Sequence, residues 1–400
     1  MRQFSLGTVL RMTDKFLLRR FFESFGADIE QVPWDDITRR NIDFLQRLFD
    51  ELPSTDRDRA EVVLRHVHAL AGEKGMESLG EAAETFHADA SWNEFFLSEM
   101  NLYSKALSAW LDYQDIFDYA IQFFQVDTLS WWRKRVDLPM IEPNFDDDAR
   151  TELEDEIASF FRTKQGRGYV CTIEMVERSN GVYYFFAYPD DYVRDTLVHD
   201  ENENLVSQTI RQTFEIVFAY DRNEGSCDLY AKLSKTLKEE LELIFLQRIL
   251  DFAPEDEEKA PYDLSMLLDP TFQLTTRPED NLDVRVTSLT LFWPGRAEIS
   301  ITPRGPLSPQ ELARQGIRFP LAQATVKKAR FRFEFLVSGT GRSKTLTFEI
   351  GPPDACTLKN QQPDRVETVH RYLKEWGMEH EDENETATTA TPRRLARPVA

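Results

Sequence analysis

Two basic clusters in this 400-residue sequence contain the residue types that bind nucleic acids or acidic partners. The first is the run Trp131, Trp132, Arg133, Lys134 and Arg135. Aromatic rings stack on bases and cations neutralise phosphates, so this combination suits a surface that holds a nucleic-acid strand. The alternatives are a helix end, where cations are favoured, and a tryptophan pair packed between domains. We therefore take these five residues as candidate nucleic-acid or partner contacts.

The second cluster lies on a predicted strand in the last third of the chain. Lys328, Arg330 and Arg332 occur at every second position, so a strand would carry all three on its outward face. Arginines on a sheet face can follow a phosphate backbone. Charges in such a position also protect an edge strand from aggregation. The formal net charge of −22 disfavours a nucleic-acid partner, so a protein partner is the first expectation and nucleic acid the second.

Metal binding is not indicated by the histidines or the acidic residues. His66 and His68 are two positions apart in a helical context, which directs them about 200° apart around the helix. Asp112, Asp115 and Asp118 could line a cleft as metal ligands or as an acid/base pair, but their spacing is more typical of the solvated edge of an amphipathic helix. No zinc or EF-hand pattern occurs, so no cofactor or metal is expected.

Nucleophilic catalysis has no recognisable pattern either. The sequence contains no GxSxG, and Cys171 and Cys227 fall in predicted strands, where a cysteine is usually a small buried apolar group. An enzyme site assembled from distant residues, such as Asp115 with His87 or Glu174 near Cys227, stays open as a further alternative. No catalytic residue is assigned, and a non-enzymatic role is favoured.

Composition indicates a folded protein without a membrane span. Apolar residues make up 41% of the chain and aromatic residues 12%, yet no apolar run approaches the roughly 20 residues that a membrane-spanning helix needs. The three cysteines are widely separated, so buried free thiols in a reducing compartment are expected. Charged residues interrupt the N-terminal segment, which therefore does not resemble a signal peptide. Together these features predict a cytoplasmic protein with no membrane partner.

The elements that must position the clusters fall into three groups, of which the first is helical. Apolar residues recur at three- and four-residue spacing through residues 1–135, with no strand pattern between them. Predicted helices begin near Thr13, cover Ile37–Phe49, begin again at Ser54, and cover Met76–Phe86 and Glu94–Phe124. We expect a helical bundle domain in residues 1–135 and a proline- and aspartate-rich linker at 136–150.

Two antiparallel α+β units are predicted next, at residues 151–258 and 284–378. In the first, a hairpin turning at Asn180-Gly181 and a second hairpin after Phe214 precede a helix over Leu237–Leu250. The polar stretch between the hairpins, Asp190–Arg211, is expected to be a partly helical crossover.

The second unit repeats this order, with hairpins through Pro294-Gly295 and Ser338–Arg342 and a final helix ending at Gly377. Each unit thus reads strand, strand, crossover, strand, strand, helix. The fold class is α+β, and the shared order raises the hypothesis of a structural duplication, which different strand orders would contradict. A linker at 259–283 separates the units, and the tail 379–400 has too little apolar content to fold.

The function expected from these features is that of a non-enzymatic protein-interaction or scaffold component of a multi-protein cytoplasmic system. It depends on the lack of a catalytic pattern, the acidity and the many aromatic residues, which interfaces favour. A nucleic-acid-binding or regulatory protein that uses the two basic clusters is the alternative. The sequence predicts neither the partner's identity nor the oligomeric state.

Overall fold

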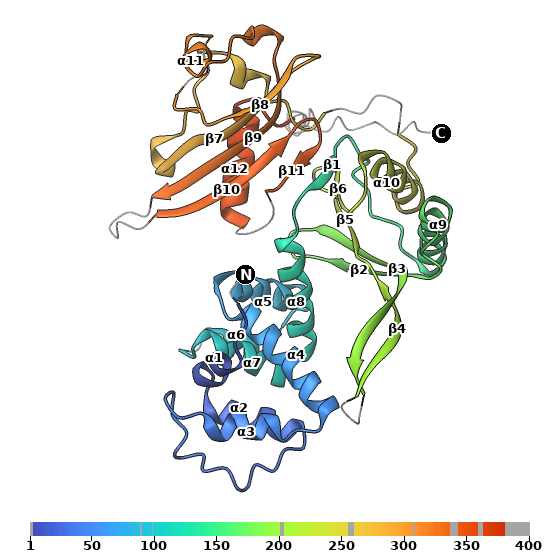
Figure 1. Cartoon of the computed structure of the whole chain (residues 1–400), viewed down its shortest axis with the longest axis vertical. Coiled ribbons are helices and arrows are strands. Elements are labelled where there is room, and N and C mark those ends of the chain that lie inside the picture. Colours follow the sequence, from blue (N-terminus) through green and yellow to red (C-terminus); the bar gives the residue numbers. More distant parts are fainter. Residues whose placement is uncertain are drawn as a thin grey trace, which may run out of the picture. The chain divides into compact units, whose positions relative to one another are not determined.

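The computed structural model describes residues 3–88, 90–97, 99–200, 204–254, 260–305, 307, 309–336, 343–358 and 363–380. In these ranges the chain forms two compact units, whose elements are labelled in Figure 1. Among the described residues, the helical unit contains those up to Leu129, the short segment Glu177–Gly181 and Pro363, and the sheet unit begins at Ser130. The run Trp131–Arg135 therefore belongs to the sheet unit and not, as predicted, to the helical domain.

The helical unit has eight helices in the part of the chain that is described. They are α1 (Leu6–Met12), α2 (Lys15–Ser24), α3 (Asp43–Asp50), α4 (Ser54–Leu70), α5 (Glu73–Thr85), α6 (Ala90–Leu97), α7 (Leu102–Asp112) and α8 (Gln114–Thr128). Their amphipathic faces meet in a core that contains the fully buried side chains of Phe21, Phe22, Phe117 and Phe123. The all-helical character predicted for this region is present.

The long helix predicted for Glu94–Phe124 is instead divided into α6, α7 and α8. The side chain of Asn101 caps α7 by accepting a hydrogen bond from the Ser104 amide at 3.1 Å. Tyr113, with φ of −142°, leaves the helical region between α7 and α8. Asp112 therefore lies on a different helix from Asp115 and Asp118, and the three aspartates do not form one helix edge.

The sheet unit contains one antiparallel sheet. Its order is β2-β3-β5-β6-β1-β11-β10-β9-β7-β8, and β4 pairs only with β3 among the described residues. The strands are β1 (Trp132–Arg135), β2 (Cys171–Glu177), β3 (Val182–His199), β4 (Leu205–Thr213), β5 (Ile216–Asp221), β6 (Ser226–Tyr230), β7 (Leu282–Trp293), β8 (Ala297–Ile301), β9 (Thr325–Leu336), β10 (Ser343–Gly351) and β11 (Ala355–Cys356). The predicted α+β class is confirmed.

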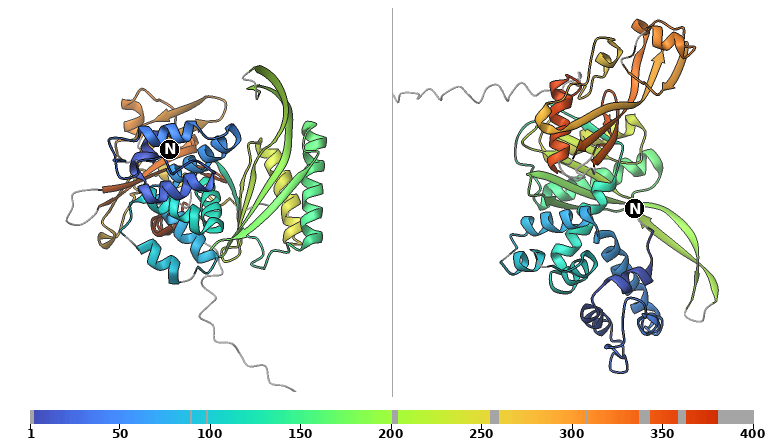
Figure 2. Two further views of the ribbon diagram at one scale, coloured as in Figure 1. Left: turned by 90° about the horizontal axis from the view of Figure 1, so that it is seen from below. Right: turned by 90° about the vertical axis from the view of Figure 1, so that its left-hand side faces the viewer.

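The first half of the sheet, β2, β3, β5 and β6, packs against two helices. These are α9 (Asp147–Gln165) and α10 (Lys235–Ile249), which run beside each other along these strands (Figure 2). Phe218 and Phe245 stack across this interface with ring centroids 4.4 Å apart. The hairpin predicted at Asn180-Gly181 is present between β2 and β3, and Gly181 has the positive φ of +79° that such a turn needs.

The second half contains β7 to β11 and the helix α12 (Pro363–Glu375). Its core includes Phe331, Phe333 and Phe348 from the strands and Trp376 just after the helix. Short helical segments η1 (Ser265–Leu268), η2 (Pro278–Asp280), α11 (Pro309–Arg314) and η3 (Leu321–Gln323) connect these strands. The predicted β9–β10 hairpin is present, whereas its predicted turn at Ser338–Arg342 lies outside the described residues.

The two halves differ in strand order. In the first half the hairpins follow one another as β2-β3-β5-β6, whereas in the second β7 lies between β8 and β9. The segment predicted as a helical crossover in the first half is a strand pair, because β3 continues to His199 and β4 pairs with it. A structural duplication is not confirmed, and the unequal strand orders argue against it.

The segments predicted as linkers contribute to the core of the sheet unit. Leu138 and Ala149 from the first are buried, as are Tyr262 and Leu264 from the second. Glu379, which the sequence assigned to the tail, is also buried and lies opposite Tyr262 in a β-bridge. These segments have few apolar residues, but those few are enough to attach them to the sheet. Residues 381–400 lie outside the described part of the chain.

Two glycines at the end of α9 allow a matched test of this packing. A Cβ on Gly168 would lie 2.7 Å from the Cβ of Phe161, and its φ is +80°. Gly166 has φ of +68° but no atom within 4 Å of its added Cβ. We expect Gly166→Ala to cost about 1 kcal/mol for the left-handed backbone alone. Gly168→Ala should cost about 1–3 kcal/mol more from overpacking, measured by urea denaturation. Equal losses would contradict the close contact with Phe161.

Candidate interaction site

The first predicted cluster forms β1, the strand that joins the two halves of the sheet. Arg133 pairs in register with Leu229 of β6 on one side and with Ala355 of β11 on the other. The side chains from Trp132 to Arg135 are all buried. Trp131 is the only member of the cluster that is exposed, at 45%. The cations therefore lie inside the sheet unit and are not on its surface.

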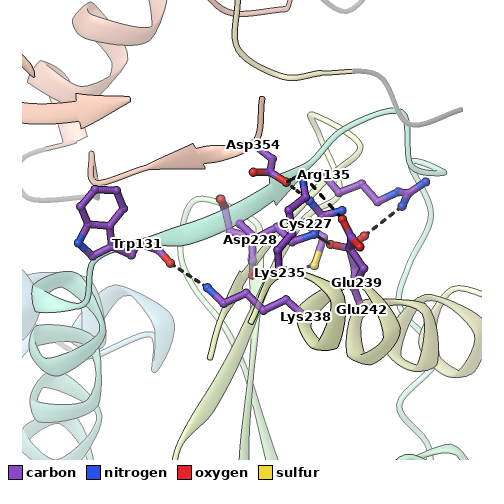
Figure 3. Close-up of polar contacts among 10 residues, drawn as sticks. Trp131, Arg135, Cys227, Asp228, Lys235, Lys238, Glu239, Glu242 and Asp354 are labelled. Atoms are coloured by element: carbon purple, nitrogen blue, oxygen red, sulfur yellow. Dashed lines mark hydrogen bonds and ion pairs between the residues drawn. The ribbon is translucent and has the colours of Figure 1, made fainter. Parts of the chain in front are cut away.

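Arg133 and Arg135 are two positions apart on β1 and point to the same side of the strand, where they share the carboxylate of Glu242. Figure 3 shows Arg135 beside Glu242. Nε of Arg133 lies 3.0 Å from Oε2 of Glu242, and Nη1 of Arg135 lies 3.1 Å from Oε1. Glu242 belongs to α10 and has no exposed surface. Arg133 also contacts Asp354, which precedes β11. Each charge in this group thus has a counter-charge from another element, as burial requires.

Lys134 points to the opposite side of β1 and has its own carboxylates. Its Nζ lies 3.3 Å from Oε1 of Glu379 and 3.4 Å from Oε2 of Glu224. Burial alone would lower the pKa of Lys134, but the nearby carboxylates of Glu379, Glu224 and Asp228 raise it above its usual range. Lys134 is therefore a permanent cation within this network.

Glu379 is the anion that completes the Lys134 side of the network. Its Oε2 lies 2.7 Å from Nδ1 of His370 on α12. Burial alone would raise the pKa of Glu379, but His370 and Lys134 hold it at about 2. The residues after α12 are thereby attached to β1 by charge.

The second predicted cluster lies on the solvent-facing side of β9. The side chains of Lys328, Arg330 and Arg332 are 41%, 51% and 41% exposed. Lys328 and Arg330 both contact Glu349 of β10, which is opposite Arg330 in register. Nη2 of Arg332 lies 3.3 Å from Glu334 of the same strand. This face therefore carries cations whose charge is partly balanced by neighbouring carboxylates.

The structure brings one residue from each cluster together. Nζ of Lys328 lies 4.9 Å from the centroid of the Trp131 ring. The backbone carbonyl of Trp131 also accepts a hydrogen bond from Lys238 of α10 at 3.1 Å (Figure 3). The exposed remainder of the two predicted clusters is thus a single surface made by Trp131, Lys328, Arg330 and Arg332.

Sequence reasoning missed an exposed element of the sheet unit, a two-stranded arm. Beyond Ala187, β3 leaves β5 and pairs with β4, from Asp190 opposite Thr213 to His199 opposite Leu205. Figure 2 shows this arm extending from the sheet. Strand propensity was the available signal, because Leu205–Thr213 is rich in β-branched residues. The sequence of the arm shows no alternation of apolar and polar residues, because both faces of the arm are exposed.

The arm carries apolar side chains at its surface. Leu197 is 66% exposed, Leu205 61%, Tyr192 50% and Val193 47%. The register places Val193, Leu197 and Leu205 on one face, because their cross-strand partners are Arg211, Ser207 and His199 respectively. A large exposed apolar surface is costly in water and commonly marks an interaction site.

The base of the arm is fixed by Asp191. Its Oδ1 accepts a hydrogen bond from Nη1 of Arg167 at 2.7 Å, and its Oδ2 accepts one from Nη2 of Arg194 at 3.0 Å. The guanidinium of Arg167 in turn stacks over the Phe214 ring, 3.8 Å from its centroid. Burial would raise the pKa of Asp191, but the Tyr192 amide and Arg167 lower it below its usual value. These contacts orient the arm as it leaves the sheet.

A groove of about 690 Å³ lies beside β7 in the second half of the sheet. Its walls come from the segment after η1, from β7 and from the residues after β8. Phe272, Val284 and Val286 supply apolar surface, and Arg285 and Arg304 supply charge. No group of three histidine, cysteine, aspartate or glutamate side chains in the described residues is arranged to hold a metal.

The three cysteines are buried free thiols, as predicted. Burial raises the pKa of Cys171 to about 12, so this thiol is protonated at neutral pH and is a poor nucleophile. Among the described residues, no helix is long and apolar enough to cross a membrane.

Comparison with known proteins adds no relative: no family model, no curated protein and no solved structure matches this chain.

Glu242 gives the sharpest test of the buried network. Glu242→Gln removes the anion shared by Arg133 and Arg135, and we expect it to lower the free energy of unfolding by about 3–5 kcal/mol. Glu239→Gln on the same helix is the matched control, because Glu239 is partly exposed and pairs with Lys235 at 3.8 Å. That change should cost less than about 1 kcal/mol. Urea denaturation of both variants measures the difference, and similar losses would contradict the network.

Glu379 makes stability depend on pH. Its pKa is lowered from 4.5 to about 2, so its contribution is complete above pH 4.5 and is lost as the pH falls towards 2. Glu379→Gln should remove on the order of 3 kcal/mol at neutral pH and flatten the acid dependence in that window. The exposed Glu375, changed to Gln, is the control. Thermal melts between pH 2 and 7 measure how the melting temperature depends on pH. If Glu379→Gln falls in melting temperature with acid as steeply as the wild type, the assigned role of Glu379 is refuted.

Proposed function

We propose that this chain is a non-enzymatic protein-interaction component of a multi-protein assembly, and that the β3–β4 arm is its principal contact surface. The observation that supports this most strongly is the exposure of Leu197 and Leu205 on an ordered two-stranded arm. An isolated hairpin is only marginally stable in water. An arm of this length therefore gains most from a partner that covers it.

The construction of the arm supports a binding role. The Asp191 contacts with Arg167 and Arg194 hold its base, so less conformational entropy is lost when a partner binds. The outer edge of an antiparallel arm also presents unpaired backbone groups, which bind an added strand in many recognition complexes. A rigid base and exposed edges together suit docking of another polypeptide.

Nucleic-acid binding is the second candidate, and the surface of Trp131, Lys328, Arg330 and Arg332 favours it. The ring of Trp131 is exposed beside Lys328. Proteins that bind single-stranded nucleic acids combine an aromatic stacking surface and a cation in this way. It ranks second because Glu349 and Glu334 already pair with these cations and the chain carries a net charge of −22.

An enzymatic role ranks third. Cys227, proposed with Glu174 as a distant pair, has no exposed surface, and Cys171 is held as a neutral thiol. Cytoplasmic location remains the proposal that best fits three buried free thiols.

Removal of the arm tests the proposed function. Residues 192–212 are replaced by an Asn-Gly turn, which leaves Asp191 and its hydrogen bond with Arg167 in place. Tagged wild-type and armless proteins are expressed in the native host, and captured proteins are quantified by mass spectrometry. We expect the specifically captured proteins to fall by at least about tenfold, because the arm supplies the central apolar contacts. The melting temperature should change little, and full capture by the armless protein would refute the proposal.

A matched surface variant separates the second candidate from the first. Lys328, Arg330 and Arg332 are changed to Ser in one protein, which leaves the arm intact. This variant should retain the captured proteins. If the wild type instead binds a single-stranded oligonucleotide at low salt and the variant does not, nucleic-acid binding replaces protein binding as the supported function.

A further inference from the structure

The outer edge of β4 differs from a protected edge strand. β4 has nine residues, with β3 as its only strand partner in the described chain. It contains no proline or lysine, which are common devices that prevent strands from pairing at an edge. Arg211 is its only charged residue. A long edge without such protection is a template for another strand.

We propose that β4 pairs antiparallel with β4 of a second copy of this chain, about a two-fold axis at Gln208. This inference rests on the proposed function, since it names the occupant of one edge of the arm. The pairing would convert two arms into a four-stranded sheet across the dimer. A two-fold interface must be self-complementary, and three properties of β4 show that this edge is.

The first property is the direction of the backbone groups. Asn204 accepts a hydrogen bond from the Asp200 amide at 2.9 Å, and the Phe214 amide donates to Pro189 at 3.0 Å. Even-numbered positions of β4 therefore turn their amides and carbonyls towards β3. The odd-numbered positions, Leu205, Ser207, Thr209 and Arg211, turn theirs outward. A two-fold axis at Gln208 opposes odd positions with odd positions, so the outward groups can pair.

The second property is the match of side chains. With the axis at Gln208, Val206 lies opposite Ile210 of the second copy, and Ile210 lies opposite the second copy's Val206. These are positions without direct hydrogen bonds between them, where side chains approach most closely. Val198 of β3 lies beside Val206 in register and extends the apolar row. An axis one residue later, at Thr209, would place Val206 opposite Gln212 instead.

The third property is charge. The axis at Gln208 places Arg211 opposite Leu205 of the second copy, so no like charges meet along the edge. The net charge of −22 disfavours contact between copies over most surfaces, but β4 itself carries only the positive charge of Arg211. Repulsion between two acidic chains is therefore small where these edges meet.

The expected dimer is reversible. One nine-residue strand is less than the 20–30 residues that each side of a typical stable interface contributes. Sedimentation velocity from about 1 to 200 µM, on the intact chain, should therefore show a monomer–dimer equilibrium. The other occupant considered is a strand from a different protein, which the tests below separate from self-pairing.

Single cysteines test the register, because the three native cysteines are buried and unavailable for cross-linking. Gln208→Cys faces itself across the axis, at the spacing of about 4.5–5.5 Å that a cross-strand disulfide tolerates. Mild oxidation should give a covalent dimer rapidly. Val206→Cys and Ile210→Cys should each cross-link at least about tenfold more slowly alone, but a mixture of the two should form the mixed dimer. Self-cross-linking of Val206→Cys faster than Gln208→Cys would overturn the axis at Gln208.

A pair of charge variants tests which edge is used. Gln208→Lys places two like charges in contact at the axis and should abolish the dimer. Thr196→Lys, directly opposite Gln208 on β3, adds the same charge on the same face one strand away and should leave the dimer intact. Loss of the dimer in Thr196→Lys alone would assign pairing to the β3 edge and overturn the proposal. Thermal melts confirm that both exposed substitutions leave the fold unchanged.

Failure of this inference is distinguishable from failure of the proposed function. If the wild type is monomeric at 200 µM and Gln208→Cys gives no covalent dimer, self-pairing is refuted. The armless protein would then still show, by the loss or retention of its captured proteins, whether the arm binds a different partner.

Discussion

The carboxylate of Glu242, buried in α10, is the interaction on which the continuity of the sheet depends. It lies against two arginines of β1, the only strand that touches both halves of the sheet among the described residues. Without an anion there, two guanidiniums would be buried beside each other, which costs several kcal/mol. Lys134 repeats the arrangement on the other side of the same strand, with Glu379 and Glu224. The central strand is thus held by buried ion pairs as well as by the buried ring of Trp132.

This arrangement explains why the basic run could not be placed from the sequence. Three consecutive cations normally lie in water, because each costs free energy to bury alone. Their counter-charges are distant: Glu242 is 107 residues from Arg135, Asp354 is 221 from Arg133, and Glu379 is 245 from Lys134. A single sequence does not show that such residues meet. The β9 cations were placed on an outward face because strand alternation is local and needs no distant partner.

The fold was predictable where periodicity reports burial. Several helices of the first unit and the β9–β10 strands have one apolar face and were found, although α6, α7 and α8 were predicted as one helix. The Asn180-Gly181 hairpin was found from its turn residues instead, because the first part of β3 is buried on both faces. The arm has two exposed faces, so Thr196, Leu197 and Val198 show no alternation, and the segment looked like a polar crossover. Strand order was also out of reach, because the position of β7 between β8 and β9 depends on pairing across the sheet. The only exposed part of the first cluster, Trp131, could not be singled out before β1 was placed.

The position of β1 has a consequence for the order in which the two halves of the sheet can fold during synthesis. β1 leaves the ribosome before both of its neighbours, β6 and β11, and before all three of its principal anions. Its cations must stay hydrated until Glu242 arrives, and its second edge stays open until Asp354 and Glu379 follow. The first half can close around β1 early, whereas the second half can join only after β11 and Glu379 have been made. During translation the continuous sheet therefore forms in two steps, in which β6 and then β11 pair with the central strand β1.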